Sequence, residues 1–167
     1  LRATRRRTLA LVAVATGAAA AVTDQFILLA YDSRYHGAAF MIPPLFVGVW
    51  FSILSAFADA MMMGAGKPAA GAWANGAKFL VMLVGLPLAL AQGDFFAALL
   101  VLVAAEAARW LVLIPPSRKE QLAKPGDDLA LTALMAASAL ATKAIAGALG
   151  LAPSIAEWWA MRGLLQV

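Results

Sequence analysis

The residues from Gly37 to Gly66 include a single charged side chain, Asp59, in thirty consecutive positions. A helix of that length in a soluble domain needs a polar face toward water, and this stretch has none. Spanning ~30 Å of hydrocarbon at ~1.5 Å per residue takes ~20 apolar residues, which the segment supplies. Similar runs recur along the chain. The sequence therefore predicts an all-α, polytopic membrane protein with a single membrane domain over residues 1–167.

The composition leads to the same prediction. Hydrophobic residues make up 63% of the chain and charged residues 13%, with a mean hydropathy of +0.84. A typical soluble domain is about 25% charged. The basic residues stand in short clusters between apolar runs and form no stripe, so the net charge of +4 indicates membrane orientation, with no nucleic-acid partner.

Five transmembrane helices are predicted, and polar residues and prolines mark several of their boundaries. The triplet Thr23–Gln25 is expected to interrupt the first span. Pro43–Pro44 is expected in the first turn of the second span, where a missing N–H costs least. Pro87 is expected to kink the third span, and Pro115–Pro116 to end the fourth. The predicted spans cover residues 8–31, 43–63, 73–91, 95–114 and 129–151.

Both ends of the chain carry a prediction. Ser154 and Glu157 have capping-box spacing beside the pair Trp158 and Trp159, which indicates an interfacial helix or a partial sixth span. The chain begins at Leu1 rather than Met, and its first apolar run is too long for a cleaved signal peptide. We therefore expect further chain upstream, with this sequence as the C-terminal part.

Lysine and arginine are distributed unequally between the two predicted sides. With five crossings, most of them fall on the side that holds the N-terminus, and few fall on the other. The first side carries Arg2, Arg5, Arg6, Arg7, Lys67, Lys78, Arg118, Lys119 and Lys124; the second carries Arg34 and Arg162. The positive-inside rule then predicts a cytoplasmic N-terminus for this chain.

Ionisable residues inside the spans are candidates for function, because they are costly in lipid and tend to face protein or water. Lys143 lies ~12 Å of helix rise from the outer end of the fifth span, too deep for comfortable snorkelling. The stripe of small residues around it comprises Ala136, Ala139, Ala146 and Gly147. The substrate-cavity candidates are Lys143, Arg109, Asp24, Asp59, Ser52 and Ser55.

Each candidate also has a structural interpretation. Glu106 and Arg109, three residues apart, are expected to neutralise each other locally. Asp59 reaches the cytoplasmic interface in one interpretation, and Ser52 and Ser55 then bond the backbone of their own helix.

The functional interpretation makes a different prediction about helix packing. Gly48, Ser52, Ser55 and Asp59 share one helical face, and this face is expected to line a cavity together with Lys143. The fifth span would then pack on the second.

Signatures of catalysis are missing from the sequence. It has no cysteine and one histidine, so no thiolate or imidazole cluster is expected to hold a metal. It lacks the spacing of a P-loop, a zinc-protease helix and a nucleophile elbow. We therefore expect no enzyme activity, no metal and no cofactor.

Four short motifs, in this order, resemble the C-terminal half of bacterial polysaccharide-export flippases of the multidrug/oligosaccharidyl-lipid/polysaccharide superfamily. Members show an outer loop of the type L-Y-x-x-x-Y-x-x-A, an inner G-K/R-P turn, an Asn-bearing entry to the next span and a G-x-x-x-A turn. The corresponding residues here are Ile27–Ala39, Gly64–Pro68, Asn75–Lys78 and Gly93–Ala97.

The resemblance implies a transporter of two six-helix lobes that moves undecaprenyl-pyrophosphate-linked oligosaccharide across the bacterial inner membrane for surface polysaccharide synthesis. It implies partners as well: the lipid-linked oligosaccharide, membrane lipid and the missing N-terminal lobe of the same protein. Lys143 and Arg109 would then contact phosphate or acidic sugars, and Asp24 and Asp59 would carry a coupling ion. The alternative is a small membrane scaffold or assembly subunit with no transported substrate, in which the small-residue stripe serves helix packing.

Overall fold

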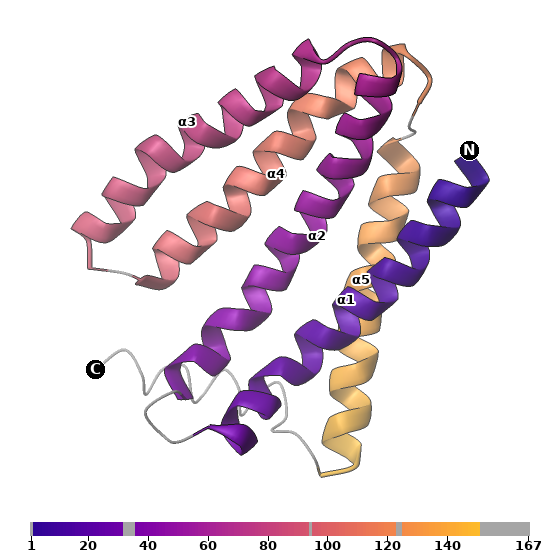
Figure 1. Cartoon of the computed structure of the whole chain (residues 1–167). Coiled ribbons are helices and arrows are strands. Elements are labelled where there is room, and N and C mark those ends of the chain that lie inside the picture. Colours follow the sequence, from indigo (N-terminus) through magenta and orange to yellow (C-terminus); the bar gives the residue numbers. More distant parts are fainter. Residues whose placement is uncertain (1, 32–35, 94, 123–124, 151–167) are drawn as a thin grey trace.

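The chain forms five long helices in a computed structural model, which describes residues 2–31, 36–93, 95–122 and 125–150 (Figure 1). The helices are α1 (Arg2–Ala30), α2 (His36–Gly64), α3 (Ala69–Ala91), α4 (Phe95–Lys119) and α5 (Pro125–Ala148). The described residues include no strand. All five helices are long and apolar enough to cross a membrane, which confirms the predicted all-α class and its five spans.

The most extensive helix–helix contacts link the five helices in a series. Their order in this series is α5, α1, α2, α4, α3, since α1 packs on α5 and α2, and α4 packs on α2 and α3. The N-terminus, the α2–α3 turn and the α4–α5 connection lie at one end, which we call the basic end (Figure 1). α3 is the outermost helix beside α4 and is widely exposed, with Trp73 and Phe79 on its surface.

The helix ends differ from prediction at the prolines. Pro43 and Pro44 lie beyond the first turn, because α2 already begins at His36. α4 continues through Pro115–Pro116 to Lys119, so the prediction that they end it is wrong. Their fixed φ is compatible with a helix, although each proline removes one i→i−4 hydrogen bond and crowds the preceding turn. The helix ends instead where Gln121 adopts a φ of 54° and Leu122 N–H bonds Ser117 O at 3.0 Å.

Other helices are longer or more continuous than expected. α1 starts at Arg2 and runs without interruption through the polar triplet Thr23–Gln25. Thr23 donates its hydroxyl hydrogen to Ala19 O at 2.6 Å, so its polar group is satisfied within the helix. α5 starts at Pro125 with Asp127 and Asp128 in its first turn, where carboxylates favour the helix N-terminus. α3 continues across Pro87 to Ala91.

The apolar core lies where α1, α2, α4 and α5 meet, from the middle of the helices toward the basic end. Trp50, which is fully buried, donates its indole N–H to Thr132 Oγ1 at 2.9 Å and so joins α2 to α5. The core residues are Leu9, Ala13, Trp50, Leu54, Trp110, Leu131 and Met135. The predicted C-terminal interfacial segment, with Ser154, Glu157, Trp158 and Trp159, lies outside the described residues.

Candidate functional site

Asp24 and Lys143 form an ion pair between α1 and α5, near the end of the molecule opposite the basic end. The Asp24 side chain is only 2% exposed and that of Lys143 is 13% exposed. Pairing offsets much of the cost of placing each charge in an apolar interior. Lys143 was expected to face a hydrated cavity as a single cation, whereas the structure gives it a carboxylate partner.

A second ion pair holds the same two helices together at the basic end. Arg5 donates to Asp128 Oδ1 at 2.8 Å, and the two side chains are 9% and 5% exposed. Between the two ion pairs, Gly17 allows the helix backbones to approach closely: a Cβ added there would lie 2.2 Å from Met135 O. Ser138 on α5 donates to Val14 O at 2.9 Å. α1 and α5 therefore form one tightly joined pair, which we call the α1–α5 pair.

Asp59 and Arg109 form a further ion pair between α2 and α4. Arg109 Nη2 lies 3.3 Å from Asp59 Oδ2, and both side chains are largely buried. α3 crosses close to this point, since a Cβ added at Gly71 would lie 2.0 Å from Asp59 Oδ1. The carboxylate thus lies in a three-helix contact.

Glu106 pairs with Lys78 of α3, and not with Arg109. The prediction that Glu106 and Arg109 neutralise each other locally is therefore wrong. Spacing of three along a helix places two side chains on one face, but each here finds a partner on a different neighbouring helix. Together with the ion pair between Lys67 and Glu120, these contacts join α2, α3 and α4 into what we call the α2–α3–α4 group.

The two serines of α2 occupy different surroundings. Ser55 is fully buried and donates to Phe51 O at 2.8 Å, which confirms that it bonds its own helix. Ser52 lines a cavity of about 360 Å³ among α2, α3 and α4, together with Gly48, Lys78 and Glu106. The ion pair between Lys78 and Glu106 therefore lies beside an opening whose other walls are mostly apolar.

Lys143 and Asp59 do not share a surface. Lys143 contacts α1, and Asp59 lies near the basic end between α2 and α4. The fifth span was expected to lie close enough to the second for its small-residue stripe to pack there. α5 packs chiefly on α1 instead and contacts α2 at the Trp50–Thr132 hydrogen bond and in the apolar core. Helical periodicity assigns a residue to a face, but it leaves open which neighbour covers that face.

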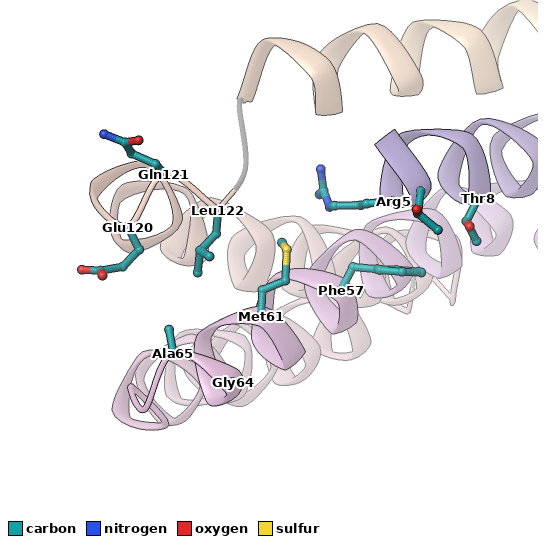
Figure 2. Close-up of a pocket in the computed structure, with 10 residues that line it drawn as sticks. Arg5, Thr8, Phe57, Met61, Gly64, Ala65, Glu120, Gln121 and Leu122 are labelled. Atoms are coloured by element: carbon teal, nitrogen blue, oxygen red, sulfur yellow. The ribbon is translucent and has the colours of Figure 1, made fainter. Parts of the chain in front are cut away.

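A groove of about 780 Å³ lies at the basic end, between α1, α2 and the segment that follows α4; we call it the basic-end groove (Figure 2). In Figure 2, Met61 and Leu122 point toward each other and Arg5 reaches from α1 toward Leu122. Residues from all three segments contribute to its wall: Thr4, Arg5, Thr8, Phe57, Met61, Glu120 and Leu122.

The sequence did not predict a groove at Arg5, because arginines in the N-terminal tail are explained equally well as a signal for membrane orientation. One feature distinguishes Arg5 from the neighbouring arginines. Arg5 shares a helical face with Thr4 and Thr8, whereas Arg6 and Arg7 lie on other faces and are exposed. The Nε atom of Arg5 is buried and has no hydrogen-bond partner in the described structure.

The groove also lies on the boundary between the α1–α5 pair and the α2–α3–α4 group. Within the described ranges, every ion pair joins elements of the same assembly, and none crosses from α1 to α2. Across the boundary lie the apolar core and the Trp50–Thr132 hydrogen bond. No three metal-ligating side chains gather anywhere in the described part of the chain.

Comparison with known proteins gives no relative. No protein family, curated protein or solved structure matches this chain.

Proposed function

We propose that this chain is the C-terminal lobe of a transporter that flips undecaprenyl-pyrophosphate-linked oligosaccharide across the bacterial inner membrane, with its N-terminus cytoplasmic. The substrate class comes from the order of the four flippase-like motifs between Ile27 and Ala97. Five membrane-spanning helices with buried charges support a transport role, since such charges are costly in lipid and commonly mark substrate or ion pathways.

The observation that carries the proposal is that each predicted cation forms an ion pair with one of the predicted carboxylates. Lys143 is bound to Asp24, and Arg109 is bound to Asp59, each across a helix interface. An anionic phosphate competes for the same cation that the carboxylate holds. Phosphate that binds either cation therefore displaces the carboxylate partner in this mechanism.

The arrangement of the ion pairs also supports movement. They join helices inside the α1–α5 pair and inside the α2–α3–α4 group, and the basic-end groove lies between these two assemblies. In the proposed cycle the two assemblies rock against each other about the apolar core. The groove then opens and closes toward the cytoplasm, and the ion pairs hold the helices of each assembly together until phosphate displaces a carboxylate.

Polymer export in cells that depend on this protein tests the proposal. Lys143→Ala leaves Asp24 without its cation, and we expect it to abolish export. Lys67→Ala is the matched control, because it also removes a lysine from an ion pair, but one at the exposed α2–α3 turn. Unchanged polymer output from Lys143→Ala, with the protein present at normal level, would refute the assignment.

A membrane scaffold is the second candidate. It is favoured because the ionisable residues inside the helices are paired with residues of neighbouring helices. Asp24, Asp59, Lys78, Glu106, Arg109 and Lys143 all have interhelical partners, as helix packing alone would require. The exchange Asp24→Lys with Lys143→Asp separates the two functions, since it restores an ion pair with reversed polarity. A flippase should regain stability but not export, because the cation has moved from α5 to α1. A scaffold should regain both stability and export.

A further inference from the structure

We propose that the basic-end groove binds one anionic phospholipid, with the headgroup phosphate on Arg5 and an acyl chain against Phe57, Met61 and Leu122. The inference does not depend on transport, because a stationary bundle would hold the lipid equally well. The apolar side chains come from α2 and from the segment after α4, whereas the arginine comes from α1 (Figure 2).

Arg5 carries the polar half of the proposal. Its side chain is only 9% exposed, and one amino group bonds Asp128 Oδ1 at 2.8 Å. A guanidinium has five N–H donors in a planar fork that matches two oxygens of a phosphate. The Nε donor is buried without a partner, and an unpaired buried donor is unfavourable. A phosphate in the groove would bind the guanidinium donors that Asp128 leaves free.

The surroundings match an anionic amphiphile in both charge and depth. Thr4 and Thr8 line the wall next to Arg5. Glu120, the acidic residue of the wall, is paired with Lys67. The next two residues of α1 are arginines as well, and both add exposed positive charge on the same helical turn. The groove lies at the ends of the apolar stretches of α1 and α2, which is the level of lipid headgroups.

Lipid retention in the purified protein tests this inference. The protein is reconstituted in nanodiscs that contain phosphatidylglycerol and phosphatidylcholine, extracted into detergent and analysed by native mass spectrometry. We expect one phosphatidylglycerol to be retained. Arg5→Lys keeps the charge that pairs with Asp128 but removes the fork, and it should weaken retention about tenfold. Arg7→Lys makes the same exchange on an exposed face and should leave retention unchanged.

A second variant tests the apolar wall without altering any charge. Met61→Trp places a larger, rigid side chain in the apolar wall and should weaken retention, which keeps the inference testable if Arg5→Lys lowers stability. Thermal unfolding of each variant identifies such a loss. Equal retention of phosphatidylcholine, full retention by Met61→Trp, or an equal loss in Arg5→Lys and Arg7→Lys would overturn the proposal. So would binding of free inorganic phosphate with no lipid retained.

Discussion

Replacing Gly17 by alanine should force α1 and α5 apart. The added Cβ would lie 2.2 Å from Met135 O, 3.0 Å from Ala139 N and 3.0 Å from Ser138 Cβ. A carbon normally approaches a carbonyl oxygen to about 3.3 Å, so the helices must separate by roughly 1 Å. The closest obstacle is backbone, which cannot turn away as a side chain can.

The cost of this separation is mainly weaker van der Waals packing between the two helices. A gap of 0.5–1 Å forfeits roughly a quarter to a half of each dispersion contact, and overpacking typically costs about 1–3 kcal/mol. Loss of the hydrogen bond from Ser138 to Val14 O adds about 1 kcal/mol. The higher helix propensity of alanine offsets up to about 1 kcal/mol. We therefore expect Gly17→Ala to lower the free energy of unfolding by about 1–3 kcal/mol.

Titration with sodium dodecyl sulfate in mixed micelles, followed by tryptophan fluorescence, measures this change. Gly76→Ala is the matched control, because no atom lies within 4 Å of the Cβ added in α3. It should raise stability by about 0.5–1 kcal/mol through propensity alone. If Gly17→Ala is as stable as Gly76→Ala, the close approach of α1 to Met135 is refuted.

Two further changes probe the core and the orientation. Thr132→Val should cost about 1–3 kcal/mol of unfolding free energy, because it leaves the buried indole N–H of Trp50 unpaired. Thr23→Val, whose hydroxyl bonds its own helix, should cost less, and an equal cost would contradict the role of the interhelical bond. For orientation, Gln92→Cys and Ala69→Cys introduce single thiols at exposed positions of opposite ends in a chain with no cysteine. An impermeant reagent added to intact cells should label Gln92→Cys alone, and labelling of Ala69→Cys from outside would reverse the predicted topology.

The sequence was sufficient to predict the helices but not their neighbours. Apolar runs of membrane-spanning length located all five spans, since that length is fixed by the bilayer. The helix ends were harder to predict, because proline blocks a donor without forbidding helical φ, as Pro115 and Pro116 demonstrate. The order in which the helices pack is set by contacts between residues distant in sequence, which local hydrophobic periodicity does not predict.

The candidate site was likewise predictable only in part. Buried charge correctly marked Asp24, Asp59 and Lys143 as residues that turn toward protein. Helical periodicity did not identify the ion-pair partners of these residues, although the distance of each residue from the end of its helix narrows the choice of partner. Asp24 lies six residues before the end of α1 and Lys143 five residues before the end of α5, so their heights match. The basic-end groove could not be predicted, because it forms from three segments distant in sequence.

The placement of the ion pairs determines where the bundle is easiest to deform. Breaking a buried ion pair costs about 3–5 kcal/mol, and the α1–α5, α2–α4 and α3–α4 interfaces each carry at least one ion pair between described residues. Among the described residues, the boundary between α1 and α2 is held by apolar contacts, and the Trp50–Thr132 hydrogen bond beside it contributes about 1 kcal/mol. Apolar side chains slide past one another without leaving an unpaired charge. A rearrangement that opens the basic-end groove is therefore expected to shear this boundary while Asp24–Lys143 and Asp59–Arg109 remain closed.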